Sequence, residues 1–195
     1  IIADNTYLYL GTDNGILVYN YRTDKYEQPD TDFPTDVRTM VLQGDTLWVG
    51  SLNGLYTYQL KSRQLNHFDS KQTGLPHNTI YSIIHTKDNQ IYIGTYNGLC
   101  RYVQASGKFE NILLPVNRGG SNLFVNSLLE DTTRQCIWIG MEGYLFQYNP
   151  TIGEMKAIEV FHNNSIKSLA YHSRFTQYPV TNQQYYLEHI LGSGT

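Results

Sequence analysis

The chain has 195 residues, enough for one domain with a substantial hydrophobic core, and its formal net charge is −3 with 14 basic and 17 acidic side chains. This near balance, without a long run of either sign, argues against a nucleic-acid partner and against an anionic membrane surface. No apolar run approaches the roughly 18 residues that span a bilayer, and no Cys and His spacing is typical of a metal site. We therefore expect no membrane contact by this segment, no metal and no cofactor.

The first recurring motif along the chain is Leu8-Tyr9-Leu10-Gly11, in which two apolar residues flank an aromatic one and a glycine follows. An Asn-Gly pair comes next, and Asn-Gly between two apolar runs is the strongest short signal for a β-hairpin. The motif recurs as Leu47-Trp48-Val49-Gly50, Ile91-Tyr92-Ile93-Gly94 and Ile137-Trp138-Ile139-Gly140, the last with a turn one residue shorter. The sequence therefore predicts hairpins near residues 7–19, 46–58, 90–102 and 136–148.

The four motif glycines are 39, 44 and 46 residues apart. A period of about 40–50 residues that is built from short strands is typical of propeller blades. An apolar run precedes the hairpin (residues 37–42, 79–84 and 124–129), and a more polar strand follows it (residues 64–68 and 108–112). We predict an all-β fold, a β-propeller of four-stranded blades, with about four blades within residues 1–172.

The motif strands are apolar on both faces, unlike the strands of a sheet with one face in water. A propeller blade has a neighbour on each side, so we expect the aromatic residues Tyr9, Trp48, Tyr92 and Trp138 to fill one gap between blades each. The two cysteines lie at positions that are not equivalent in their repeats, and buried free thiols are favoured over a disulfide.

The two ends of the chain depart from the repeat. Ile1 and Ile2 align with the end of an innermost strand, so the chain is expected to begin inside a blade, without a secretory signal. Residues 165–170 suggest a fifth innermost strand, and residues 173–195 are an off-pattern tail such as a truncated or frame-shifted terminus would have. Two interpretations stay open: part of a larger propeller, or a closed four-bladed ring in which residues 165–170 complete the first blade.

The stretches 47–55, 91–99 and 74–83 resemble the two-component regulator propeller repeat, which reads roughly W-I-G-T-x-x-G-L-x-x-Y and then G-L-P-x-N-x-V-x-S-I. The likeness covers residues 1 to about 170 and weakens at Met141-Glu142-Gly143. It implies a partial seven-bladed propeller from the periplasmic sensor region of hybrid two-component systems of Bacteroidetes. Such regions detect glycan fragments and relay to a histidine kinase, which this chain does not contain.

Ligand contacts are expected at the end of the propeller where the hairpin turns lie. Tyr96 stands in a turn where Asp13 and Leu52 stand in other repeats, and its ring can stack on a sugar. His77 and Arg118 lie on loops that reach the same face. Asn53 and Asn97 complete the candidate set, although Asn before Gly is first of all a turn signal.

Three kinds of function remain open on these observations. The first is a non-catalytic sensor module that binds an oligosaccharide or another small ligand. The second is a carbohydrate-active lyase or hydrolase, although the sequence has no G-x-S-x-G motif, and Glu130-Asp131 is better interpreted as a strand-end turn than as an acid/base pair. The third is an architectural module that binds the remaining blades of a parent sensor or a second copy as a homodimer.

Overall fold

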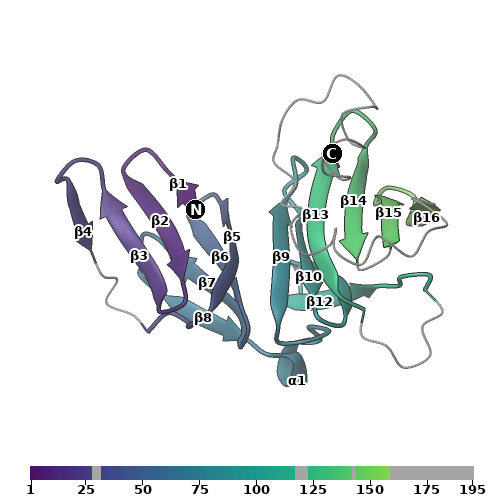
Figure 1. The fold of residues 1–195 in the computed structure, drawn as a ribbon, viewed down its shortest axis with the longest axis horizontal. Coiled ribbons are helices and arrows are strands. Elements are labelled where there is room, and N and C mark those ends of the chain that lie inside the picture. The colour runs from purple at the N-terminus through teal and green to yellow at the C-terminus, as the bar shows by residue number, and fades with distance from the viewer. Residues whose placement is uncertain (28–31, 117–122, 142–143, 159–195) are drawn as a thin grey trace, which may run out of the picture.

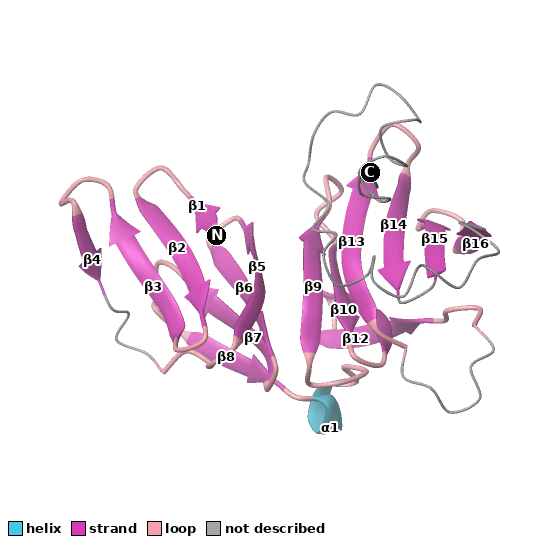
Figure 2. Cartoon of the chain, in the orientation of Figure 1, coloured by secondary structure: helices cyan, strands magenta, loops and turns pink. Residues whose placement is uncertain are grey.

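The computed structural model describes residues 1–27, 32–116, 123–141 and 144–158. In these residues, strands form four antiparallel sheets of four strands each (Figure 2). The first sheet holds β1 (Ile2–Ala3), β2 (Tyr7–Thr12), β3 (Gly15–Asn20) and β4 (Lys25–Glu27). The second holds β5 (Val37–Gln43), β6 (Thr46–Ser51), β7 (Gly54–Gln59) and β8 (Leu65–Phe68). The third holds β9 (Ile80–His85), β10 (Ile91–Thr95), β11 (Gly98–Val103) and β12 (Lys108–Ile112), and the fourth β13 (Val125–Asp131), β14 (Cys136–Met141), β15 (Tyr144–Asn149) and β16 (Glu154–Ile158).

Each sheet is a simple meander in which strands adjacent in sequence are also adjacent in space. The first strand of each sheet is one edge, and β5, β9 and β13 pack against one another in succession. The first and fourth sheets lie at opposite ends of the molecule's longest axis (Figure 1). The predicted all-β propeller class of four-stranded blades is thus confirmed. Residues 165–170, on which the closed-ring alternative depends, and the tail 173–195 lie outside the described residues.

The hydrophobic core consists of three clusters, one in each space between neighbouring sheets. In each space, one motif aromatic residue packs with two aliphatic residues of the next sheet. Tyr9 of β2 packs with Leu47 and Val49 of the second sheet. Trp48 of β6 packs with Ile91 and Ile93 of the third sheet, and Tyr92 of β10 with Ile137 and Ile139 of the fourth. The three aromatic side chains are at most 4% exposed. Each strand therefore buries alternate residues against the sheet before it and the sheet after it.

Trp138 differs from its three equivalents because it is only half-buried. Its neighbours Ile137 and Ile139 face the third sheet, so Trp138 lies on the other face of the fourth sheet. Its indole N–H donates to Asp131 Oδ2 at 3.1 Å. The same support recurs in the first two sheets, where Tyr9 donates to Asp4 Oδ2 and the Trp48 indole to Gln43 Oε1.

The motif glycine forms the joint between one sheet and the next. A Cβ built on Gly11 would lie 2.5 Å from Val37 Cγ1, on Gly50 2.5 Å from Ile80 Cγ2, and on Gly94 2.6 Å from Val125 Cγ1. Val37, Ile80 and Val125 are each at the start of the first strand of the following sheet. The absence of a side chain at the glycine thus lets the next sheet pack directly on the backbone.

A short helix, α1 (Ser70–Thr73), interrupts the loop from β8 to β9, where the sequence pattern predicted only a loop. The Asp69 side chain accepts hydrogen bonds from the backbone N–H groups of Lys71 and Gln72, and Gly74 ends the turn in the left-handed region with φ 82°. Both cysteines are buried and free, as expected.

Candidate functional site

The hairpin turns gather at one end of the sheets, which we call the turn face. It comprises the turns at residues 13–14, 52–53 and 96–97 and the loops that lead into β5, β9 and β13. Each turn is hydrogen-bonded to the loop that enters the next sheet. Asp36 N donates to Asp13 O at 3.0 Å, Thr79 Oγ1 to Leu52 O at 3.2 Å, and Gly98 N to Leu123 O at 2.9 Å. The turn face is therefore a connected surface rather than a set of separate loops.

An aromatic cluster lies on the turn face at the third sheet. The rings of His77 and Tyr96 have centroids 4.9 Å apart, and Tyr96 meets Phe124 edge-to-face at 4.2 Å. Phe124 is also 6.1 Å from Tyr81, and all four side chains are half-buried. We call His77, Tyr81, Tyr96 and Phe124 the aromatic cluster. Two of its members, Tyr96 and His77, were candidates from the sequence alone, whereas Phe124 and Tyr81 were not singled out.

The backbone fixes the position of both candidate rings. Tyr96 N donates to Thr79 O at 2.9 Å, which ties the turn to the start of the innermost strand. His77 Nδ1 accepts a hydrogen bond from Thr79 N at 3.0 Å. A neutral imidazole that accepts at Nδ1 carries its proton at Nε2, so the outer nitrogen of His77 is a donor.

The two asparagine candidates occupy the turns in a structural role. Asn53 N donates to Ser51 Oγ at 3.0 Å, and Asn97 N donates to Thr95 Oγ1 at 3.1 Å. The following glycines have φ of 134° and 116°, which the tight turn requires. Both asparagine side chains are exposed and lie in different sheets, Asn97 next to Tyr96. Arg118 lies outside the described residues.

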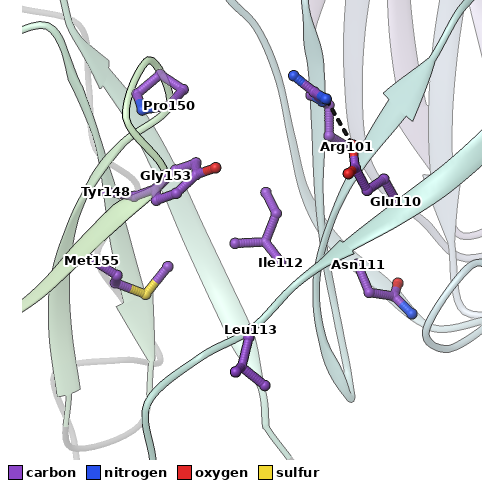
Figure 3. A pocket seen from close by; sticks show the side chains of 9 residues that line it. All are labelled: Arg101, Glu110, Asn111, Ile112, Leu113, Tyr148, Pro150, Gly153 and Met155. Atoms are coloured by element: carbon purple, nitrogen blue, oxygen red, sulfur yellow. Dashed lines mark hydrogen bonds and ion pairs between the residues drawn. The ribbon is translucent and has the colours of Figure 1, made fainter.

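A concavity of about 260 Å³ lies between the outer strands of the third and fourth sheets. Figure 3 shows Arg101, Glu110, Ile112, Tyr148 and Met155 around it. Arg101 Nη2 and Glu110 Oε2 form an ion pair at 2.7 Å, which raises the pKa of Arg101. Because the Arg101 guanidinium is already paired with Glu110, the groove presents no unpaired charge from these two residues to a ligand.

The carboxylates that the sequence placed side by side are engaged in structural hydrogen bonds. Glu130 accepts from Lys87 N at 3.0 and 3.1 Å through its two oxygens. Burial disfavours ionisation of Asp131, but hydrogen bonds from Arg134 and Trp138 outweigh it and lower the pKa. Glu130 thus ties the end of β13 to the loop after β9, and Asp131 holds the turn between β13 and β14. Among the residues that the structure describes, no cluster of His, Cys, Asp and Glu could hold a metal.

Comparison with known proteins places this architecture in a family. A family model described as the two-component regulator propeller matches residues 74–97. A solved extracellular domain from Bacteroides thetaiotaomicron, assigned to the hybrid two-component system BT4673, is 75% identical with a TM-score of 0.79, over 84% of this chain and 22% of that one. The corresponding domain of BT3049 from the same organism shares the fold, with a TM-score of 0.63 and 21% identity over 77% of this chain and 22% of that one.

A curated relative, histidine kinase P4 of Formosa agariphila, is 30% identical in a 161-residue alignment that covers 73% of this chain and 11% of the kinase. The chain thus spans a small part of each relative. The resemblance to the two-component regulator propeller repeat is confirmed, and the chain is similar to part of the extracellular domain of hybrid two-component sensors. No helix in the described ranges has the length and apolar character needed to cross a bilayer.

Proposed function

Because the chain carries the two-component regulator propeller repeat, we propose that it is a non-catalytic part of a periplasmic sensor that recognises a carbohydrate. A histidine kinase elsewhere in the longer protein receives the signal and passes it into a phosphorelay. The observation that carries the ligand assignment is the aromatic cluster on the turn face. Ligand sites combine apolar and aromatic surface with a few well-placed polar groups, and the cluster with its flanking turns has both.

Three members of the aromatic cluster have distinct parts in this proposal. Tyr96 is half-exposed and held by its backbone, so its ring offers the apolar face of a sugar a surface of fixed orientation. Phe124 supports that ring edge-to-face at 4.2 Å. His77 adds a hydrogen-bond donor at Nε2 beside the stacked rings. A rigid aromatic platform costs little conformational entropy on binding.

Isothermal titration calorimetry against an oligosaccharide panel tests the proposal. The 195-residue chain should give a saturable heat with at least one oligosaccharide, and Tyr96→Ala should weaken that binding roughly tenfold or more. Tyr21→Ala, which removes an exposed tyrosine from the turn between β3 and β4 of the first sheet, is the matched control and should leave affinity unchanged. Absence of heat with every oligosaccharide would reject the carbohydrate assignment. Turnover of a glycan that depends on a carboxylate would reject the non-catalytic assignment.

A separate observation supports a protein partner. Leu8, Leu10, Leu17 and Tyr19 form the face of the first sheet opposite Tyr9 and are only half-buried. Their equivalents in the second sheet, among them Leu47 and Val49 at 0% exposure, are covered by the preceding sheet. We propose that a preceding blade of the longer protein covers this face, since a blade is what covers every equivalent face in this chain.

Light scattering distinguishes this partner from a second copy of the chain. A fragment of the longer protein that includes one more preceding blade should be monomeric and should melt at a higher temperature than the 195-residue chain. Leu10→Lys should remove any self-association of the 195-residue chain, because a charge then replaces an apolar contact. A dimer that persists in the extended fragment would assign the face to a second copy instead.

A further inference from the structure

Three of the four innermost strands in the described residues, β5, β9 and β13, contain a β-bulge at the same place. The register of β5 against β6 skips from Val37 to Thr39, that of β9 against β10 from Ile80 to Ser82, and that of β13 against β14 from Val125 to Ser127. The unpaired residues are Arg38, Tyr81 and Asn126, which we call the bulge row. Bulges of this kind redirect a side chain and are frequent next to functional sites.

The residues on either side of each bulge determine where the unpaired side chain can go. Val37, Ile80 and Val125 pack into the clusters between sheets, and Thr39 and Ser82 lie against the motif glycines Gly50 and Gly94. The bulge-row residues belong to none of these clusters, although their neighbours do. Since β5, β9 and β13 are edge strands, the three bulges lie at the inner edge of their sheets. Because these strands pack against one another in succession, the row crosses three adjacent blades (Figure 1).

The polar side chains of Arg38 and Asn126, at the two ends of the row, have no protein partner among the described residues. Arg38 is exposed and Asn126 is half-buried. No hydrogen bond or ion pair in the described residues engages the guanidinium of Arg38 or the carboxamide of Asn126. Together they offer up to seven N–H donors and one carbonyl acceptor. Tyr81, between them, is 6.1 Å from Phe124 and so connects the row to the aromatic cluster.

We propose that the bulge row is a second subsite of the ligand-binding surface and that it holds the hydroxyl groups of a saccharide unit. Arg38 and Asn126 donate to hydroxyl oxygens on the two sides of the unit, and Asn126 also accepts from a hydroxyl. The ring of Tyr81 lies under the unit, next to the unit that stacks on Tyr96. This assignment rests on the proposed carbohydrate function, and it makes the site long enough for more than one sugar unit.

The test uses the 195-residue chain and a printed array of defined neutral and acidic oligosaccharides, from disaccharides to hexasaccharides. Calorimetry with the strongest array ligand then gives the dissociation constant for each variant. Arg38→Ala and Asn126→Ala should each weaken binding about tenfold or more, because each removes hydrogen bonds to the ligand. Tyr81→Phe should bind within about threefold of the native chain and Tyr81→Ala much more weakly, since the ring rather than the hydroxyl contacts the sugar.

Two matched controls remove the same chemistry from exposed positions outside the row. Arg22→Ala deletes a guanidinium between β3 and β4, and Asn5→Ala deletes a carboxamide between β1 and β2. Neither should change affinity, and the melting temperatures of Arg38→Ala, Arg22→Ala and Asn5→Ala should stay near that of the native chain, because exposed side chains contribute little to stability. If Arg22→Ala weakens binding as much as Arg38→Ala does, the arginine effect is a nonspecific attraction of the ligand, and the assignment of the bulge row as a subsite is wrong.

The remaining outcomes separate this inference from the function on which it rests. If the native chain binds no saccharide, the proposed carbohydrate function is rejected, and the proposed subsite at the bulge row is rejected with it. If Tyr96→Ala weakens binding while Arg38→Ala and Asn126→Ala do not, the sensor function stands and the bulge row alone is wrong.

Discussion

Gly94→Ala tests the glycine joint more directly than any other substitution in this chain. A Cβ at Gly94 would lie 2.3 Å from Ser82 Oγ, 2.6 Å from Val125 Cγ1 and 2.7 Å from the backbone oxygen of Val125. The first two atoms belong to side chains that can move, but the carbonyl oxygen belongs to the first strand of the next sheet. The backbone of β13 must therefore shift away from β10.

Overpacking of this kind typically costs about 1–3 kcal/mol. For a chain of this size each kcal/mol lowers the melting temperature by about 2–4 °C, so we expect a decrease of roughly 2–12 °C. Calorimetric melting, together with urea unfolding followed by tryptophan fluorescence, measures the change and its free energy.

Gly11→Ala is the matched control because its Cβ would meet side chains only, with Val37 Cγ1 at 2.5 Å and Met40 Cε at 3.3 Å. Adding Val37→Ala to Gly11→Ala should therefore relieve the clash, whereas adding Val125→Ala to Gly94→Ala should not. Double-mutant cycles that include the Val37→Ala and Val125→Ala single variants measure the coupling free energy of each pair. This coupling should be strong between Gly11→Ala and Val37→Ala and weak between Gly94→Ala and Val125→Ala. If Gly94→Ala melts with the native chain, or if Val125→Ala rescues it fully, the backbone contact does not limit the joint.

The Trp48 side chain is 3% exposed, so Trp48→Ala should lower the free energy of unfolding by about 3–5 kcal/mol in urea titrations. Trp138 is only half-buried, so Trp138→Ala should lower this free energy by clearly less. Equal losses would contradict the assigned burial of the two side chains. Burial raises the pKa of Tyr92 to about 12, so between pH 10 and 12 the unfolded chain loses a proton that the folded chain keeps. The free energy of unfolding should then fall by up to about 1.4 kcal/mol per pH unit from this residue, and Tyr92→Phe should show a shallower fall. Burial also raises the pKa of the Cys100 thiol. Because both cysteines are buried, Cys100 and Cys136 should react with a thiol reagent in urea but not in the native chain. Reaction of either cysteine in the native chain would show that its sheet opens locally.

The hairpins could be predicted from sequence because their signals are local. Asn-Gly demands positive φ at specific positions, and an apolar strand interrupted by Trp48 or Tyr92 requires a neighbour on both faces. The repeat then supplied the propeller class, since only a radial arrangement gives every blade such neighbours. Even α1 had its signals in the sequence, with Asp69 as the first cap and Gly74 as the last, but a single turn of helix is too short for any periodicity.

The candidate site was predictable only in part. Tyr96 and His77 came from their position on turns and loops, and their contact of 4.9 Å could not be read from residues 19 positions apart in sequence. The bulges were not predicted, because one unpaired residue in a ladder leaves the apolar pattern of the strand almost unchanged. In retrospect, one sequence signal of the bulges is a repeated triplet: Val-Arg-Thr at 37–39, Ile-Tyr-Ser at 80–82 and Val-Asn-Ser at 125–127. Its middle residue varies in chemistry, whereas a β-branched residue precedes it and a hydroxyl residue follows it in every repeat.

The glycine joints also bear on how a sensor of this construction passes on a mechanical signal. The preceding sheet contributes no side chain at Gly11, Gly50 or Gly94. The residues of the next sheet that pack on these glycines, Val37, Ile80 and Val125, are β-branched and restricted at χ1, so a change of rotamer absorbs little of a displacement there. Close-packed atoms resist compression, and the neighbouring blade must tilt instead. A row of blades joined in this way moves as one unit, so a displacement of one blade reaches the blade at the other end of the row.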